Sequence, residues 1–214
     1  LKRLCEQDPD NSDLAFQLIS NRLVGSPIAL SQDDEAAIRK ALNPGHRLVI
    51  DLLEKLMQGD WSSARSKDAE LSRWSVDDVA YPFAVRLRIP WRLESPPMER
   101  TYRCNEAISI IDQSAAFANI DGLAYFRVAA AVNADRPYVA LGTSAQLASR
   151  IGRSIHQENH ASLTAGATNL VRCFSVIQDE RLFQAVPRAR YREVLSQVQS
   201  VLSRLSSRGI GPGG

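Results

Sequence analysis

Apolar residues in this chain recur at the spacing of an α-helix, and Pro, Gly and Asn interrupt the pattern at short intervals. The clearest segment is residues 46–58, whose apolar stripe is made of Leu48, Val49, Leu52, Leu53, Leu56 and Met57. Alternation at period two is nearly absent. The best strand candidate is residues 81–89, and an isolated strand there would have no partner. The sequence therefore predicts an all-α fold.

Capping residues indicate where the helices begin and end. Ser31 with Asp34 fits a variant capping box, Asp60 fits an N-cap, and Gly59 fits the position just after a helix. Near the end of the chain, Val194, Val198, Val201 and Leu205 form a seam that would face another helix. We expect about nine or ten helices in one domain over residues 1–208, with a possible sub-boundary near residue 95 or 135. Residues 209–214 are expected to be a disordered tail.

The expected helices fall into pairs whose first members begin near residues 12, 46, 77 and 119, in steps of 34, 31 and 42 residues. The segment LKRLCEQDPDN at residues 1–11 and the turn GDWSSA at residues 59–64 add local matches. In these features the chain resembles the tetratricopeptide-repeat family. It departs from that family where Ile19 and Leu52 replace small residues and where Asp68 replaces an aromatic. The resemblance implies an α-solenoid of stacked helical hairpins whose concave face binds a peptide or protein.

Composition narrows the class of protein. The net charge is +2, and acidic residues are interleaved with 26 basic ones, so the chain as a whole is not a basic nucleic-acid binder. Only Lys2, Lys40, Lys55 and Lys67 are lysines; the arginine excess fits either anion recognition or a GC-rich genome.

The three cysteines lie far apart and form no CxxC pair, which slightly favours a reduced, cytoplasmic compartment. No stretch reaches the ~18 apolar residues of a membrane span, and no signal peptide is visible. The chain starts at Leu1 within a helical pattern, so we expect a fragment or a processed chain.

A basic stretch with interleaved aromatic residues is the strongest candidate for partner binding, because Trp, Tyr and Arg dominate interface hot spots. With the nearby turn aromatic, the candidate residues are Trp61, Arg86, Arg88, Trp91, Arg92, Arg100, Tyr102 and Arg103. If this stretch is helical, Arg88 and Arg92 lie one turn apart and could clamp a carboxylate. Alternatively, Glu94 and Glu99 neutralise these arginines as surface pairs.

Two further patterns are weaker indications of a functional site. His156 and His160 stand at i and i+4, a spacing that can share a zinc ion, but residue 157 is Gln and no third ligand is close in sequence. Residues 144–161 resemble half of a DNA-binding helix-turn-helix, with Gly152 at the turn, although Glu158 and Ala161 fall where apolar residues should be.

No catalytic motif is visible: GxSxG, a phosphate-binding Gly loop and an isolated carboxylate pair are all missing from the sequence. Cys173 with a distant His offers only generic nucleophile chemistry. We expect a protein- or peptide-binding scaffold without a cofactor, as the accessory domain of a larger bacterial-type protein. The alternatives are a DNA-binding regulator using residues 144–161 and an all-helical enzyme whose site is assembled from distant residues.

Overall fold

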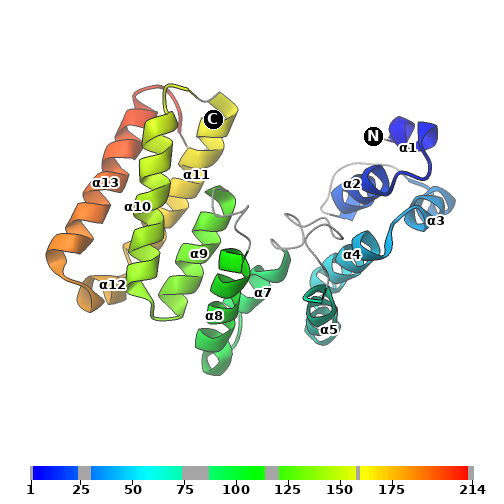
Figure 1. Cartoon of the computed structure of the whole chain (residues 1–214), viewed down its shortest axis with the longest axis horizontal. Helices are drawn as coiled ribbons and strands as arrows, with labels where there is room; N and C mark the ends of the chain where they lie inside the picture. Colours follow the sequence, from blue (N-terminus) through cyan, green and yellow to red (C-terminus); the bar gives the residue numbers. More distant parts are fainter. Residues whose placement is uncertain (1, 24–29, 74–86, 114–120, 158–159, 212–214) are drawn as a thin grey trace. The chain divides into compact units, whose positions relative to one another are not determined.

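The computed structural model describes residues 2–23, 30–73, 87–113, 121–157 and 160–211. These ranges contain twelve helices and no strand, which confirms the all-α prediction. The chain divides into two compact units, Leu1–Arg88 and Ile89–Gly214, and each is described by itself. Figure 1 labels the helices of both. That residues 1–208 form one helical-repeat domain stays a prediction.

The first unit is a series of short helices joined by tight turns. They are α1 (Lys2–Gln7), α2 (Ser12–Leu23), α3 (Gln32–Lys40), α4 (Pro44–Met57) and α5 (Trp61–Leu71). Helix α2 packs against α3 and α4, and α4 packs against α5. The core between them is built from Ala15, Phe16, Ile19, Leu42, Leu48, Val49, Ile50, Leu52, Ala64 and Leu71. Leu48, Val49, Leu52 and Leu53 of the predicted stripe of α4 are thus buried, whereas Leu56 is partly buried and Met57 at the end is 58% exposed.

The predicted caps are present in this unit. Ser31 Oγ accepts the Asp34 N–H at 3.1 Å, and Asp60 Oδ1 accepts the Ser63 N–H at 3.1 Å. Gly59 has φ +69°, a backbone conformation that favours glycine. Helix α4 begins at Pro44 rather than residue 46 because Asn43 is its N-cap and proline suits the first helical position. The pair start predicted near residue 77 and residues 81–86 lie outside the described ranges.

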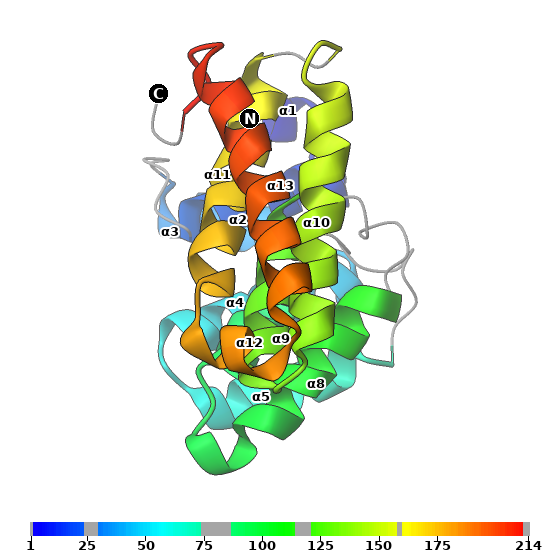
Figure 2. The ribbon, with the colours of Figure 1, turned by 90° about the vertical axis from the view of Figure 1, so that its left-hand side faces the viewer.

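The second unit is built mainly from five helices of 13 to 19 residues. Its elements are α7 (Pro90–Leu93), α8 (Pro97–Gln113), α9 (Asp121–Asn133), α10 (Pro137–Ser154), α11 (His160–Ile177), α12 (Glu180–Ala185) and α13 (Arg188–Ser206). Helix α9 packs against α8, α10 and α11, and α13 packs against both α10 and α11. Figure 2 shows α10, α11 and α13 side by side. The short α7 and α12 raise the count above the nine or ten helices expected, because four and six residues are too few for periodicity to reveal.

Helix α13 seals the second unit as its sequence predicts: Val194, Val198, Val201 and Leu205 are all buried. It ends at Ser206; in the turn that follows, Gly209 has φ +73° and the Ile210 N–H donates to the Leu205 carbonyl at 3.0 Å. Ile210 is only 4% exposed, so this residue of the predicted tail packs against the protein. In the described ranges, the longer helices all lack the apolar window that crossing a bilayer requires.

Candidate functional site

The basic-aromatic stretch predicted to bind a partner is divided between the two units. Arg86 lies outside the described residues, and Arg88 belongs to the first unit. The Arg88 Nε donates to Asp68 Oδ1 at 2.8 Å, and these side chains are only 15% and 6% exposed. Arg88 therefore does bind a carboxylate, but that carboxylate belongs to its own unit rather than to a ligand.

Trp91 and Arg92 are buried, at 6% and 4% exposed. They therefore do not lie on an open surface, where the prediction of partner binding would place them. The Arg92 guanidinium lies 4.3 Å from the Trp91 ring centroid, and that of Arg103 lies 5.5 Å from it. Glu106 approaches Arg92 at 3.7 Å and Arg103 at 2.9 Å. The hydrogen bond that Arg103 donates to Glu106 is the main cause that raises the pKa of Arg103. This cluster holds α7 on α8.

Three of the predicted residues do have exposed surface or exposed neighbours. Tyr102 is 63% exposed on α8, next to Met98 at 99%, and Arg100 donates to the Ser95 carbonyl at 3.4 Å. Trp61 is 47% exposed at the start of α5, so its side chain is only partly covered. Trp61 and Tyr102 stand in different units, so the structure does not define one surface that contains both.

The two histidines of the candidate metal pair do not share a helix. His156 lies in the turn after α10, and His160 is the first residue of α11. The i, i+4 spacing therefore does not place both imidazoles on one face of a helix. Among the described residues, His, Cys, Asp and Glu side chains nowhere gather in the groups of three that a metal site needs.

The turn predicted at Gly152 is also wrong. Helix α10 continues to Ser154, and Leu147, Ala148 and Ile151 bury their side chains in the second unit. A Cβ at Gly152 would lie 3.3 Å from Val201 Cγ2. The glycine therefore serves the close approach of α13, and residues 144–154 form one continuous helix rather than the first half of a helix-turn-helix.

The cysteines are small buried residues in both units: Cys5, Cys104 and Cys173 are all free and buried. Burial raises the pKa of Cys173 to about 12. Because the thiolate is the nucleophilic form, this thiol is inert at neutral pH.

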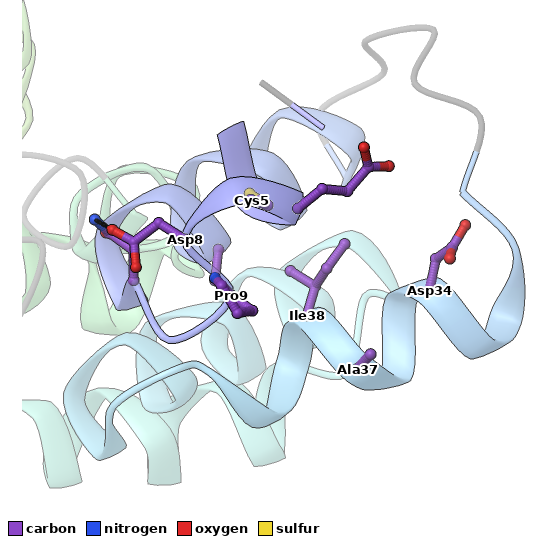
Figure 3. A pocket seen from close by; sticks show the side chains of 9 residues that line it. Cys5, Asp8, Pro9, Asp34, Ala37 and Ile38 are labelled. Carbon is purple, nitrogen blue, oxygen red and sulfur yellow. Dashed lines mark hydrogen bonds between the residues drawn. The ribbon is translucent and has the colours of Figure 1, made fainter. Parts of the chain in front are cut away.

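A pocket of about 200 Å³ opens between α1, the turn after it, the start of α2, and α3. We call it the α1–α3 pocket; it is lined by Cys5, Glu6, Asp8, Pro9, Asn11, Ala15, Asp34, Ala37 and Ile38. Figure 3 shows Ile38 and Ala37 on α3 facing the segment that carries Cys5 and Pro9. In the same view, Asp8 and Asp34 stand at opposite ends of the lining.

Local sequence explains how the α1–α3 pocket is shaped. Helix α1 stops at Gln7, two residues before Pro9, since the residue preceding a proline disfavours helix. Asn11 Oδ1 then accepts the N–H groups of Asp13 and Leu14, both at 3.1 Å, and caps α2. The Asn11 Nδ2 donates to Asp8 Oδ2 at 3.0 Å and fixes that carboxylate at the pocket edge.

The α1–α3 pocket has apolar walls and carboxylates but no cation among its lining residues. Cys5, Pro9, Ala15, Ala37 and Ile38 supply the apolar surface. The carboxylates come from Glu6, Asp8 and Asp34. Arg39, the arginine of α3, forms an ion pair with Glu35 at 2.7 Å and also bonds Glu54.

Ser12, His46 and Asp13 lie together beside this region and superficially suggest a catalytic triad. Ser12 Oγ is 2.7 Å from His46 Nδ1, and Asp13 Oδ1 is 3.6 Å from Nε2. The Asn43 N–H also donates to Ser12 Oγ at 2.8 Å. His46 also stacks on Phe16 at 4.7 Å, and neither Ser12 nor His46 lines the α1–α3 pocket. The group ties the start of α2 to the start of α4.

Sequence reasoning missed the residues of the α1–α3 pocket. The acidic residues at 33–35 look like ordinary favourable charges at a helix N-terminus. The available signal was a second acidic run at residues 6–13, on the other side of the same predicted hairpin. A hairpin brings such runs together only when its helices pack in the right register, which periodicity does not specify.

Comparison with protein-family models, curated proteins and solved structures finds no match to this chain.

Proposed function

We propose that this chain is a protein-interaction scaffold and that residues 1–88, arranged as a tetratricopeptide-like series of hairpins, bind a peptide segment in the α1–α3 pocket. The observation that carries the proposal is the pocket itself, an open apolar depression between sequential helices. Its volume of about 200 Å³ lies below the ~300–1,000 Å³ of small-molecule sites and suits a side chain of a polypeptide.

Contact between repeat-related positions supports the hairpin series. Ser12 and His46 are separated by 34 residues, the step that the repeat resemblance implies, and Ser12 Oγ meets His46 Nδ1 at 2.7 Å. The starts of α2 and α4 are thus equivalent points one period apart and in direct contact. A series built this way leaves a groove beside its helices where partners dock.

A pair of tryptophan substitutions on α3 tests the proposal. Ala36 and Ala37 are neighbouring exposed residues, but only Ala37 lines the pocket. Ala37→Trp should fill the pocket, while Ala36→Trp adds the same side chain to the adjacent face. The full chain is used to select binders from a library of short random peptides, and affinities are measured by fluorescence anisotropy.

We expect the selected peptides to bind wild type and Ala36→Trp equally and to lose at least about tenfold in affinity for Ala37→Trp. Circular dichroism of both variants shows whether the helices are intact. Peptides that bind Ala37→Trp as tightly as wild type, or a selection that yields no binder to wild type, would refute the pocket as a peptide site.

A further inference from the structure

We propose that the end of the second unit at which α10 and α13 terminate binds an acidic segment of a partner protein. The surface consists of Arg153 and His156, from α10 and the turn after it, and of Arg204 and Arg208, from α13 and the turn after it. All four residues are exposed, and we call this surface the arginine end. It belongs to a different unit from the α1–α3 pocket, so it goes beyond the peptide site proposed above and does not depend on it.

Helices α10 and α13 run in the same direction, which brings these residues together. Gln197 Nε2 donates to the Ala145 carbonyl at 3.3 Å, and the Arg204 guanidinium donates to the Gly152 carbonyl at 3.2 Å. Both contacts join residues that are 52 positions apart, so the two helices advance in step. Arg153 directly follows Gly152, and both helices terminate within one turn of this contact. Figure 2 shows them finishing at the same end of the unit.

Acidic residues are missing from the helices around the arginine end. Helices α10 and α11 contain no Asp or Glu, and the single acidic residue of α13, Glu193, is paired with Arg190 near the start of that helix. The acidic residue nearest to His156 in sequence is Glu158, which lies outside the described residues. One carboxylate cannot balance three guanidinium groups, so the arginine end stays positive.

Capping of the helix C-termini does not account for these arginines. The Gly152 carbonyl accepts from Arg204, and the Leu205 carbonyl accepts the Ile210 N–H at 3.0 Å. Within the ranges that the structure describes, the guanidinium groups of Arg153 and Arg208 make no hydrogen bond or ion pair. Basic groups also favour the dipole at a helix C-terminus, but two such termini supply about one negative charge in total. The arginine end therefore has charge left for a ligand.

The chemistry of the arginine end suits a short run of carboxylates. A guanidinium binds a carboxylate through two parallel N–H groups, and such charge-assisted pairs are among the stronger hydrogen bonds in proteins. The arginines come from two neighbouring helices, so an extended acidic peptide that crosses both can present a carboxylate to each. This gives the second unit a partner class of its own.

Other polyanions suit the arginine end less well. Single-stranded nucleic acid is held by stacking on aromatic side chains, and a duplex-binding protein commonly makes about six to ten phosphate contacts. Binding to a lipid surface uses apolar anchors or clusters of about four to eight basic residues. The large apolar residues that are exposed in the described ranges all lie outside the arginine end: Met57, Trp61, Met98, Tyr102 and Tyr138.

A charged peptide and its uncharged analogue test the inference. The probes are fluorescent octaglutamate and octaglutamine peptides, each titrated with the full chain at low and at raised salt. Fluorescence anisotropy reports the affinity. We expect octaglutamate to bind about tenfold or more tighter than octaglutamine at low salt, and this difference to shrink as salt is raised.

Matched double substitutions locate the effect. Arg153→Gln with Arg208→Gln removes two charges from the arginine end and leaves Arg204 on its carbonyl. Arg136→Gln with Arg190→Gln removes the same net charge from exposed positions at the opposite ends of α10 and α13. We expect the first double variant to bind octaglutamate at least about tenfold more weakly than wild type, and the second to bind it like wild type. Circular dichroism of both variants checks that the helices are intact.

Several outcomes would overturn the inference. They are equal affinity of the two double variants for octaglutamate, equal binding of octaglutamine and octaglutamate, and no binding to wild type at low salt. Tighter binding of random-sequence duplex DNA, or of vesicles that contain phosphatidylserine, lost in Arg153→Gln with Arg208→Gln, would assign the arginine end to nucleic acid or lipid instead. Ala37→Trp should leave octaglutamate binding unchanged, so failure at the arginine end and failure at the α1–α3 pocket are distinguishable.

Discussion

His46 shows how one polar residue can set the register between two helices. It is 6% exposed, its Nδ1 shares a hydrogen bond of 2.7 Å with Ser12 Oγ, and its ring stacks on Phe16. Burial lowers the pKa of His46 below the ordinary 6.5, and the nearby carboxylate of Asp13, which is 83% exposed, offsets this only in part. The neutral imidazole is therefore the form that the folded protein favours.

The free energy of unfolding should depend on pH through His46. The unfolded chain binds a proton near pH 6.5, while the folded chain resists it. The stabilisation is therefore complete above about pH 6.5 and is lost as pH falls through the lower folded-state pKa. Urea unfolding at a series of pH values measures this dependence of the free energy of unfolding. His46→Gln should flatten this part of the profile, and His156→Gln, at an exposed position, should not. Identical profiles for wild type and His46→Gln would contradict the assignment.

Arg88 should matter for stability rather than for binding. Its partner Asp68 is 6% exposed, so removing the guanidinium leaves a buried carboxylate without its counter-charge. We expect Arg88→Ala to lower the free energy of unfolding by about 3 kcal/mol, the low end for a broken buried pair, because Asp68 keeps further contacts. Arg73→Ala, at an exposed site, should change it by less than about 0.5 kcal/mol. Equal effects would show that the pair is unimportant.

At the scale of elements, the two glycines of α10 should respond in opposite directions to added side chains. A Cβ at Gly142 would meet nothing within 4 Å, whereas one at Gly152 meets Val201 Cγ2 at 3.3 Å. Gly142→Ala should raise the free energy of unfolding by about 0.5–1 kcal/mol through better helix propensity. Gly152→Leu should lower it by about 1–3 kcal/mol by overpacking against α13. Thermal or urea unfolding that places both changes on the same side of wild type would contradict this packing.

Element type and element ends could be predicted from the sequence because both depend on local chemistry. Ser31, Gly59 and Asp60 act as expected, since a cap depends on the backbone of its own turn. The role of Gly152 could not be predicted in this way, because the glycine is needed where Val201 of another helix approaches it. Trp91 looked like a surface anchor for the same cause: its burial depends on how α7 packs against α8, which no local pattern reveals.

At the scale of the whole molecule, the sequence predicts an all-helical chain but does not predict the α1–α3 pocket. The α1–α3 pocket joins residues 5–15 to residues 34–38, and its walls exist only after α1, α2 and α3 have packed. Its charge is likewise divided between two segments that each look ordinary alone. The basic stretch around residues 86–103 was more conspicuous in sequence, yet much of it forms internal contacts.

The most direct measurement is a map of amide chemical-shift changes by NMR when one of the peptides selected with the full chain is added to it. We predict saturable shifts at the lining residues of α1 and α3, including Glu6, Ala37 and Ile38, with α10, α11 and α13 little changed. Shifts concentrated on α10 and α13, or no saturable shift at α3, would contradict a binding site in the α1–α3 pocket.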